Sequence, residues 1–222
     1  MMAFHIWYTL LHSFWIDFLW NPFLWMIVWK SSAFTFLLLA GLSFSLAEKK
    51  YWNKIIKKYL IYSLKIAFFA LVISLWSYIL FPHMYIRFGI LHYFACAFLL
   101  LLVFRYLWYY NLVIACTIIS ISYFISPLTD TNLWLPFWFV RADFNSLDYY
   151  PLIPYFGYTL FGYVSGLFLW ERSLMNSFSL SLRPAWISPI LWMWKNSLLV
   201  YVVHLPFVYI IPYLFFLVFW LL

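Results

Sequence analysis

Charged residues are scarce in this chain of 222 residues: Asp, Glu, Lys and Arg together make up 9% of it. A soluble domain carries roughly 25% charged residues. Hydrophobic residues account for 68% of the chain and aromatic residues for 27%, and the mean hydropathy is +0.95. This scarcity of charge excludes an ordinary soluble domain and predicts an integral membrane protein.

Cysteine is nearly absent as well, and so is strict alternation of polar and apolar residues. The two cysteines, Cys96 and Cys116, lie in apolar stretches, where a thiol usually packs as a small apolar side chain. A disulfide-based fold is therefore not expected. Strands of a membrane barrel alternate over about ten residues, whereas the blocks 66–81 and 97–104 are apolar and carry no charge. The pattern favours helices.

Long apolar runs fill most of the chain. A helix needs about 20 apolar residues to cross the hydrocarbon core, so we predict an all-α integral membrane protein, a bundle of about seven transmembrane helices. Gly162 and Gly166 form a small-residue face that suits close helix packing. The expected spans are 3–20, 32–47, 60–81, 88–106, 110–127, 151–170 and 196–220, with external connections at 17–31 and 128–150.

The net charge of +7 comes mostly from one group of lysines between two apolar runs. Such groups mark the cytoplasmic side of a membrane protein, so the charge does not indicate a nucleic-acid partner. Seven crossings then place the N-terminus in the cytoplasm and the C-terminus outside. The lysines are Lys49, Lys50, Lys54, Lys57, Lys58 and Lys65.

Four of the five histidines lie in or beside apolar runs, where an ionisable group usually serves a function. Two of them share one face of the first span, and a third shares a face of the last span with two hydroxyl groups. Hydrogen bonding between helices explains these positions as well as a functional role does. The residues are His5, Thr9 and His12 in the first span, and Ser197, Tyr201 and His204 in the last.

The fourth histidine, His92, lies one helical turn beyond Arg87 at the start of the fourth span, and Asp148 precedes the sixth. A snorkelling role for Arg87 and a helix-capping role for Asp148 are one interpretation. The other is that Asp148 orients His92 as a general base. By depth alone, the polar groups suggest a column through the bundle: His5 and His204 in the inner half, and His12, His92 and Asp148 in the outer half.

Several segments carry a family resemblance in their order and spacing: FHIWYTL, LLLAGLSFSLAEKK, IRFGILHYFA, DYYPLIPYFGYTLFGYVSG and KNSLLVYVVHLP. They resemble the bacterial membrane family DUF1624, which is grouped with the catalytic domain of heparan-alpha-glucosaminide N-acetyltransferase. The resemblance implies a single transmembrane acyltransferase-like domain over 1–222 that lacks the family's N-terminal stretch. It also implies a location in the bacterial inner (plasma) membrane.

The resemblance further implies that acetyl-CoA is the co-substrate and that a histidine is central to the chemistry. The acetyl group would move from cytosolic acetyl-CoA to an amino or hydroxyl group of a sugar or envelope glycan on the outer side. No metal is expected, because no third ligand occurs at the spacing of known zinc motifs. The partners would be the lipid bilayer and the glycan, with no nucleic acid, and a homodimer is left open.

In this leading interpretation three groups of residues have roles. The first supplies the base and its orienting acid, the second binds the acceptor or the thioester arm, and the third meets the phosphates of CoA. A small-solute transporter that uses the same polar column and a non-catalytic membrane subunit stay open as alternatives. The groups are His92, His12 and Asp148; then Arg87, His5, Asn196, Ser197, Tyr201 and His204; and then Lys195, Arg172 and Arg183.

Overall fold

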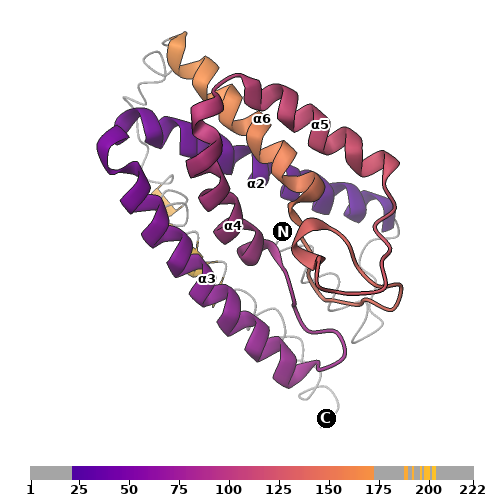
Figure 1. The fold of residues 1–222 in the computed structure, drawn as a ribbon. Coiled ribbons are helices and arrows are strands. Elements are labelled where there is room, and N and C mark those ends of the chain that lie inside the picture. The colour runs from indigo at the N-terminus through magenta and orange to yellow at the C-terminus, as the bar shows by residue number, and fades with distance from the viewer. Residues whose placement is uncertain are drawn as a thin grey trace. The chain divides into compact units, whose positions relative to one another are not determined.

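The computed structural model of the chain describes residues 22–172 and, beyond them, 188–189, 192, 196, 198–200 and 202–203. Within these residues it is helical, and only two isolated β-bridges occur. Figure 1 shows the arrangement of the main helices. They are α2 (Pro22–Lys50), α3 (Ile55–Leu80), α4 (Ile90–Phe104), α5 (Tyr110–Phe124) and α6 (Leu152–Glu171), with 3₁₀ turns η1 (Trp52–Lys54), η2 (Arg105–Leu107) and η3 (Leu135–Phe137).

The all-α prediction is confirmed for the described residues. Four of their helices are long and apolar enough to cross a membrane, and α5 is a shorter apolar helix. The seven crossings and the orientation of the termini stay predictions, because the expected span 3–20 and most of 196–220 lie outside the described residues. The four candidate spans are Met26–Lys50, Trp52–Leu80, Ile90–Leu107 and Leu152–Glu171.

The expected connection at 17–31 is wrong for residues 22–31, because α2 begins at Pro22. Proline suits the first position of a helix, where its missing N–H is not needed. The residues that follow are mostly apolar, and the single charge at Lys30 does not end the helix. The third span likewise starts five residues earlier than predicted, at Ile55, so Lys57 and Lys58 lie in the first turns of α3.

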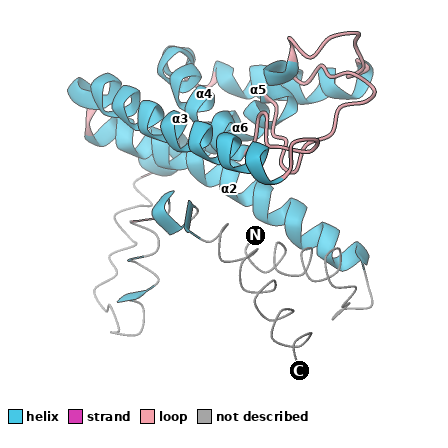
Figure 2. Ribbon diagram, turned by 90° about the horizontal axis from the view of Figure 1, so that it is seen from below, coloured by secondary structure: helices cyan, strands magenta, loops and turns pink. Residues whose placement is uncertain are grey.

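Two compact units divide the chain, and the site described below lies in the unit Phe36–Ser179. Within it α4 packs along α3, and α5 packs along α6, while α4 also contacts α6. The order of neighbours is therefore α3, α4, α6 and α5. Figure 2 shows the long connection from α5 to α6, which lies at one end of these helices.

Close contact between α2 and α6 depends on glycine. A side chain at Gly162 would overlap the backbone of Leu38, and one at Gly166 would overlap the hydroxyl of Ser45. The small-residue face predicted from the sequence is confirmed, because it lets the two helix backbones approach each other. On the α2 side Gly41 makes the matching approach to the backbone of Thr159.

Candidate functional site

Polar side chains gather at both ends of α4. The α4 N-terminal cluster consists of Ser74, Arg87, Gly89, His92 and Asp148. It joins the end of α3, the start of α4 and the residues that lead into α6. Because these segments are distant in the sequence, the cluster depends on how the helices pack.

Asp148 caps α4. Its Oδ2 atom accepts a hydrogen bond of 2.9 Å from the backbone N–H of Ile90, one of the N–H groups that have no partner within the helix. A carboxylate is favourable at this end of the helix dipole. A Cβ atom at residue 89 would overlap the Asp148 carboxylate, so glycine at that position permits the contact. The helix that Asp148 caps is thus α4, and not α6, which follows it directly.

His92 uses both ring nitrogens. Nδ1 accepts a hydrogen bond of 3.3 Å from the backbone N–H of Gly89, and Nε2 lies 3.2 Å from the hydroxyl of Ser74. Ser74 donates its own proton to the carbonyl of Ile86 at 2.6 Å, so the serine oxygen acts as acceptor toward the ring. This pattern assigns the neutral form of His92 that carries its proton on Nε2.

The structure brings His92 and Asp148 to the same helical turn without joining them. Asp148 holds the first residue of α4, and His92, two residues later, reaches back to Gly89. No hydrogen bond connects the two side chains, both of which lie in the described part of the chain. Asp148 and His92 are therefore linked through the backbone of the turn and not by direct contact between their side chains.

Arg87 lies between two aromatic rings. Its guanidinium carbon is 4.9 Å from the ring centre of Tyr85 and 5.5 Å from that of Phe144. Its Nε is buried and makes no hydrogen bond to any described residue. Cation–π contacts with both rings hold the charge in place, and a buried donor without an acceptor is available to a ligand.

Backbone hydrogen bonds fix the two segments that carry this cluster. Leu147 donates to the carbonyl of Met84 at 2.8 Å, and Tyr150 donates to that of Phe88 at 2.9 Å. On the α3 side the hydroxyl of Ser77 accepts the N–H of Ile86 at 3.0 Å. Ser74 and Ser77 were not predicted to contribute, although two serines three residues apart in an apolar run are a recognisable polar face.

The pH dependence of stability tests the burial of the Asp148 carboxyl group. Burial raises the pKa of the Asp148 carboxyl from its usual 3.8 to about 6, and the hydrogen bond from Ile90 opposes part of the shift. Between these values the folded protein keeps a proton that the unfolded chain has lost, so stability falls as pH rises through this window. We expect the midpoint of thermal unfolding in detergent to show this fall, and Asp148→Asn to flatten it.

The exposed Asp130 in the same connection supplies the matched control for that experiment. Asp130→Asn is expected to keep the profile of the unmodified protein. If Asp148→Asn follows the same profile as Asp130→Asn, burial of the Asp148 carboxylate contributes nothing to the pH dependence.

The α4 C-terminal cluster is a buried ion pair that the sequence analysis missed. Nη1 of Arg105 lies 3.8 Å from Oε1 of Glu48, and the two side chains are 5% and 3% exposed. Tyr163 donates to Oε2 of Glu48 at 2.9 Å, which ties α6 to α2. The signal was present, since Glu48 is the only acid among the lysines of that segment.

Aromatic rings hold the cations around this second cluster. The guanidinium of Arg105 lies over Trp52, the ammonium of Lys49 lies over Trp108, and that of Lys58 lies over Tyr51. Nε and Nη1 of Arg105 make no hydrogen bond to the described residues. The Glu48–Arg105 pair and the His92–Asp148 turn therefore lie at opposite ends of α4, which agrees with their predicted placement on opposite sides of the membrane.

The remaining predicted site residues are only partly described. Arg172 is exposed, with its guanidinium over the ring of Phe168, and Asn196 donates its side-chain amide to the carbonyl of Trp192 at 2.9 Å. Among the described residues, no three His, Cys, Asp or Glu side chains lie close enough to hold a metal ion. Outside the described residues lie His5, His12, Arg183, Lys195, Ser197, Tyr201 and His204.

Comparison with known proteins identifies the family of the chain. Residues 1–206 match the protein family described as heparan-alpha-glucosaminide N-acetyltransferase, catalytic. No curated protein and no solved structure matches. The match covers most of the chain, and the apolar helices agree with a membrane-embedded enzyme domain. The chain therefore belongs to the heparan-alpha-glucosaminide N-acetyltransferase catalytic family.

Proposed function

We propose that the protein is a membrane acetyltransferase that uses cytosolic acetyl-CoA and acts on an amino or hydroxyl group of a sugar or envelope glycan across the membrane. The family match over residues 1–206 carries this proposal. The two polar clusters at opposite ends of α4 support it, because donor and acceptor would approach from opposite sides. The lysine-rich end would then face the cytoplasm.

In the proposed reaction the acceptor nitrogen or oxygen attacks the thioester carbonyl. A bond from the acetyl carbon to the acceptor forms, the bond to sulfur breaks, and the acceptor proton passes through a base to the departing thiolate of CoA. His92 or His12 is the base in this proposal. For His92, Nδ1 must first leave the N–H of Gly89, since that nitrogen carries the free lone pair in the described form.

Asp148 has a positioning role in this proposal. Its carboxylate holds the N–H of Ile90 and so fixes the turn that carries His92. Arg87, with its buried Nε lacking an acceptor in the described structure, would bind the oxygen-rich acceptor. Of the remaining residues, His5, Asn196, Ser197, Tyr201 and His204 would line the path of the thioester arm, and Lys195, Arg172 and Arg183 would bind the phosphates of CoA.

Release of CoA tests the proposal directly. Purified protein in detergent is mixed with acetyl-CoA labelled in the acetyl group and with glucosamine, and both free CoA and labelled sugar are measured. We expect the two products in equal amounts, because each transfer releases one of each. N-acetylglucosamine, whose amine is blocked, is the matched acceptor that separates transfer to nitrogen from transfer to oxygen.

Release of CoA no faster than spontaneous hydrolysis, with amino and hydroxyl acceptors alike, would contradict an acetyltransferase. Uptake of a solute into liposomes that contain the same preparation would then favour the transporter interpretation.

A further inference from the structure

The connection between α5 and α6 exposes large apolar side chains that no described residue covers. Leu133 is 84% exposed, and Leu128, Trp134 and Phe137 are 60%, 57% and 46% exposed. They come from a stretch of about ten residues, whereas exposed apolar residues on soluble surfaces are usually scattered. Contact of these apolar side chains with water is therefore unfavourable.

This apolar surface continues from the end of α5. With 15 residues, α5 is about 22 Å long, which is shorter than the hydrocarbon core of about 30 Å. Its last residues, Tyr123 and Phe124, are 80% and 87% exposed, as expected for side chains that face lipid. The connection begins directly after them and supplies the apolar surface that α5 lacks at this end.

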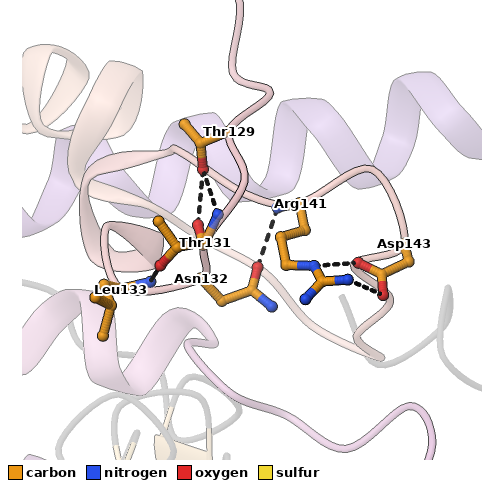
Figure 3. Close-up of polar contacts among 6 residues, drawn as sticks. All are labelled: Thr129, Thr131, Asn132, Leu133, Arg141 and Asp143. Carbon is orange, nitrogen blue, oxygen red and sulfur yellow. Dashed lines mark hydrogen bonds and ion pairs between the residues drawn. The ribbon is translucent and has the colours of Figure 1, made fainter.

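Part of the backbone of the connection is hydrogen-bonded from within, which lowers the cost of a non-helical segment at the edge of a membrane. The side chains of Ser126, Thr129, Thr131 and Asn132 accept four of its N–H groups. Val140 donates to Pro127 and accepts from Thr129 at 2.8 and 2.9 Å. Figure 3 shows the side chains of Thr129, Thr131 and Asn132 turned toward backbone groups of the same connection.

A charged pair follows the apolar stretch in the same connection. Arg141 pairs with Asp143 through two contacts of 3.0 and 3.2 Å, and the two side chains are 52% and 68% exposed. An ion pair this exposed belongs in water or among lipid headgroups. The connection thus carries large apolar side chains between residues 128 and 137, with the exposed Asp130 among them, and a charged pair after them at Arg141 and Asp143.

We propose that residues 125–140 form an interfacial loop that inserts Leu133 and Trp134 into the lipid at the membrane surface nearest the α4 N-terminus. Tryptophan prefers this depth of a bilayer. The inference does not depend on acetyl transfer. The loop also reaches the candidate site, since Tyr149 donates to the carbonyl of Leu135 at 2.8 Å. Insertion would therefore fix the depth at which Asp148 and Arg87 lie.

Spin labels on single cysteines test the insertion. The full chain, with Cys96 and Cys116 replaced by alanine, carries a label at Leu133→Cys, and its collision rates with oxygen and with a water-soluble nickel complex are measured in vesicles. Phe124→Cys is the lipid reference, and the exposed Ala142→Cys is the matched control beside the charged pair. Unchanged thermal unfolding of each variant verifies the fold.

We expect the ratio of oxygen to nickel collisions at residue 133 to approach the ratio at residue 124 and to exceed that at residue 142. A ratio equal to that at residue 142 would overturn the proposal, because Leu133 would then lie in water. An immobile label that meets neither reagent would overturn it as well, because protein would then cover the loop.

Discussion

Replacing His92 with glutamine is expected to lower the rate of acetyl transfer by about 10²–10⁴, the range attributed to a general base. Glutamine at this position can still accept a hydrogen bond from the N–H of Gly89, as Glu and Gln do in a capping box. It cannot, however, take the proton from the attacking amino or hydroxyl group. The helix start should therefore persist while proton transfer fails. The measurement is initial CoA release at saturating acetyl-CoA, together with circular dichroism of the purified variant.

Ser74→Ala is the matched control for His92. It removes the partner of Nε2 and the hydrogen bond to the carbonyl of Ile86, yet it leaves the imidazole in place. We expect it to lower the stability of the protein and to have only a small effect on the rate of acetyl transfer. An unchanged rate of transfer in His92→Gln would exclude His92 as the base and leave His12 as the candidate base.

Replacing Glu48 with glutamine is expected to lower the free energy of unfolding by about 3–5 kcal/mol, the usual effect of removing one partner of a buried ion pair. Glutamine can still accept the hydrogen bond from Tyr163, so the variant isolates the loss of charge. Arg105, 5% exposed, would remain buried without its counter-ion. Unfolding by a denaturing detergent in mixed micelles measures the change.

Two further variants serve as controls for Glu48→Gln. Glu171 is exposed and accepts a hydrogen bond of 2.6 Å from Tyr109, so Glu171→Gln should change the unfolding free energy by no more than about 0.5 kcal/mol. The double variant Glu48→Met with Arg105→Met should recover much of the loss, because no unpaired charge is left in the interior. If Glu48→Gln is as mild as Glu171→Gln, the pair contributes little to stability.

Helix positions followed closely from the sequence where apolar runs end at charge or proline. The sixth span was expected at 151–170, and α6 covers Leu152–Glu171. The start of α2 was missed because residues 17–31 were expected to form an external connection, whereas the helix begins at Pro22 and continues through Lys30, whose ammonium can extend away from it. Local composition thus identifies a helix more securely than it identifies the ends of that helix.

The candidate site was predictable only in part. Arg87, His92 and Asp148 stood out because polar groups are costly in apolar surroundings, and all three lie around the start of α4. Their partners could not be predicted, since Ser74 and Gly89 matter only through geometry. The expectation that Asp148 orients the His92 ring directly rested on the two residues lying at a similar depth in the membrane. Depth alone does not specify whether two side chains face each other.

By itself, the sequence determined that this protein is a helical membrane protein whose lysines gather between two apolar runs, because hydrophobicity and charge act along the chain. The tertiary structure decided that Asp148 caps α4, that His92 binds Gly89 and Ser74, and that Glu48 meets Arg105. Apart from the contact between His92 and Gly89, these contacts join segments that are distant in sequence. Only side-chain packing, including the close approach at Gly89 and Gly162, could select them.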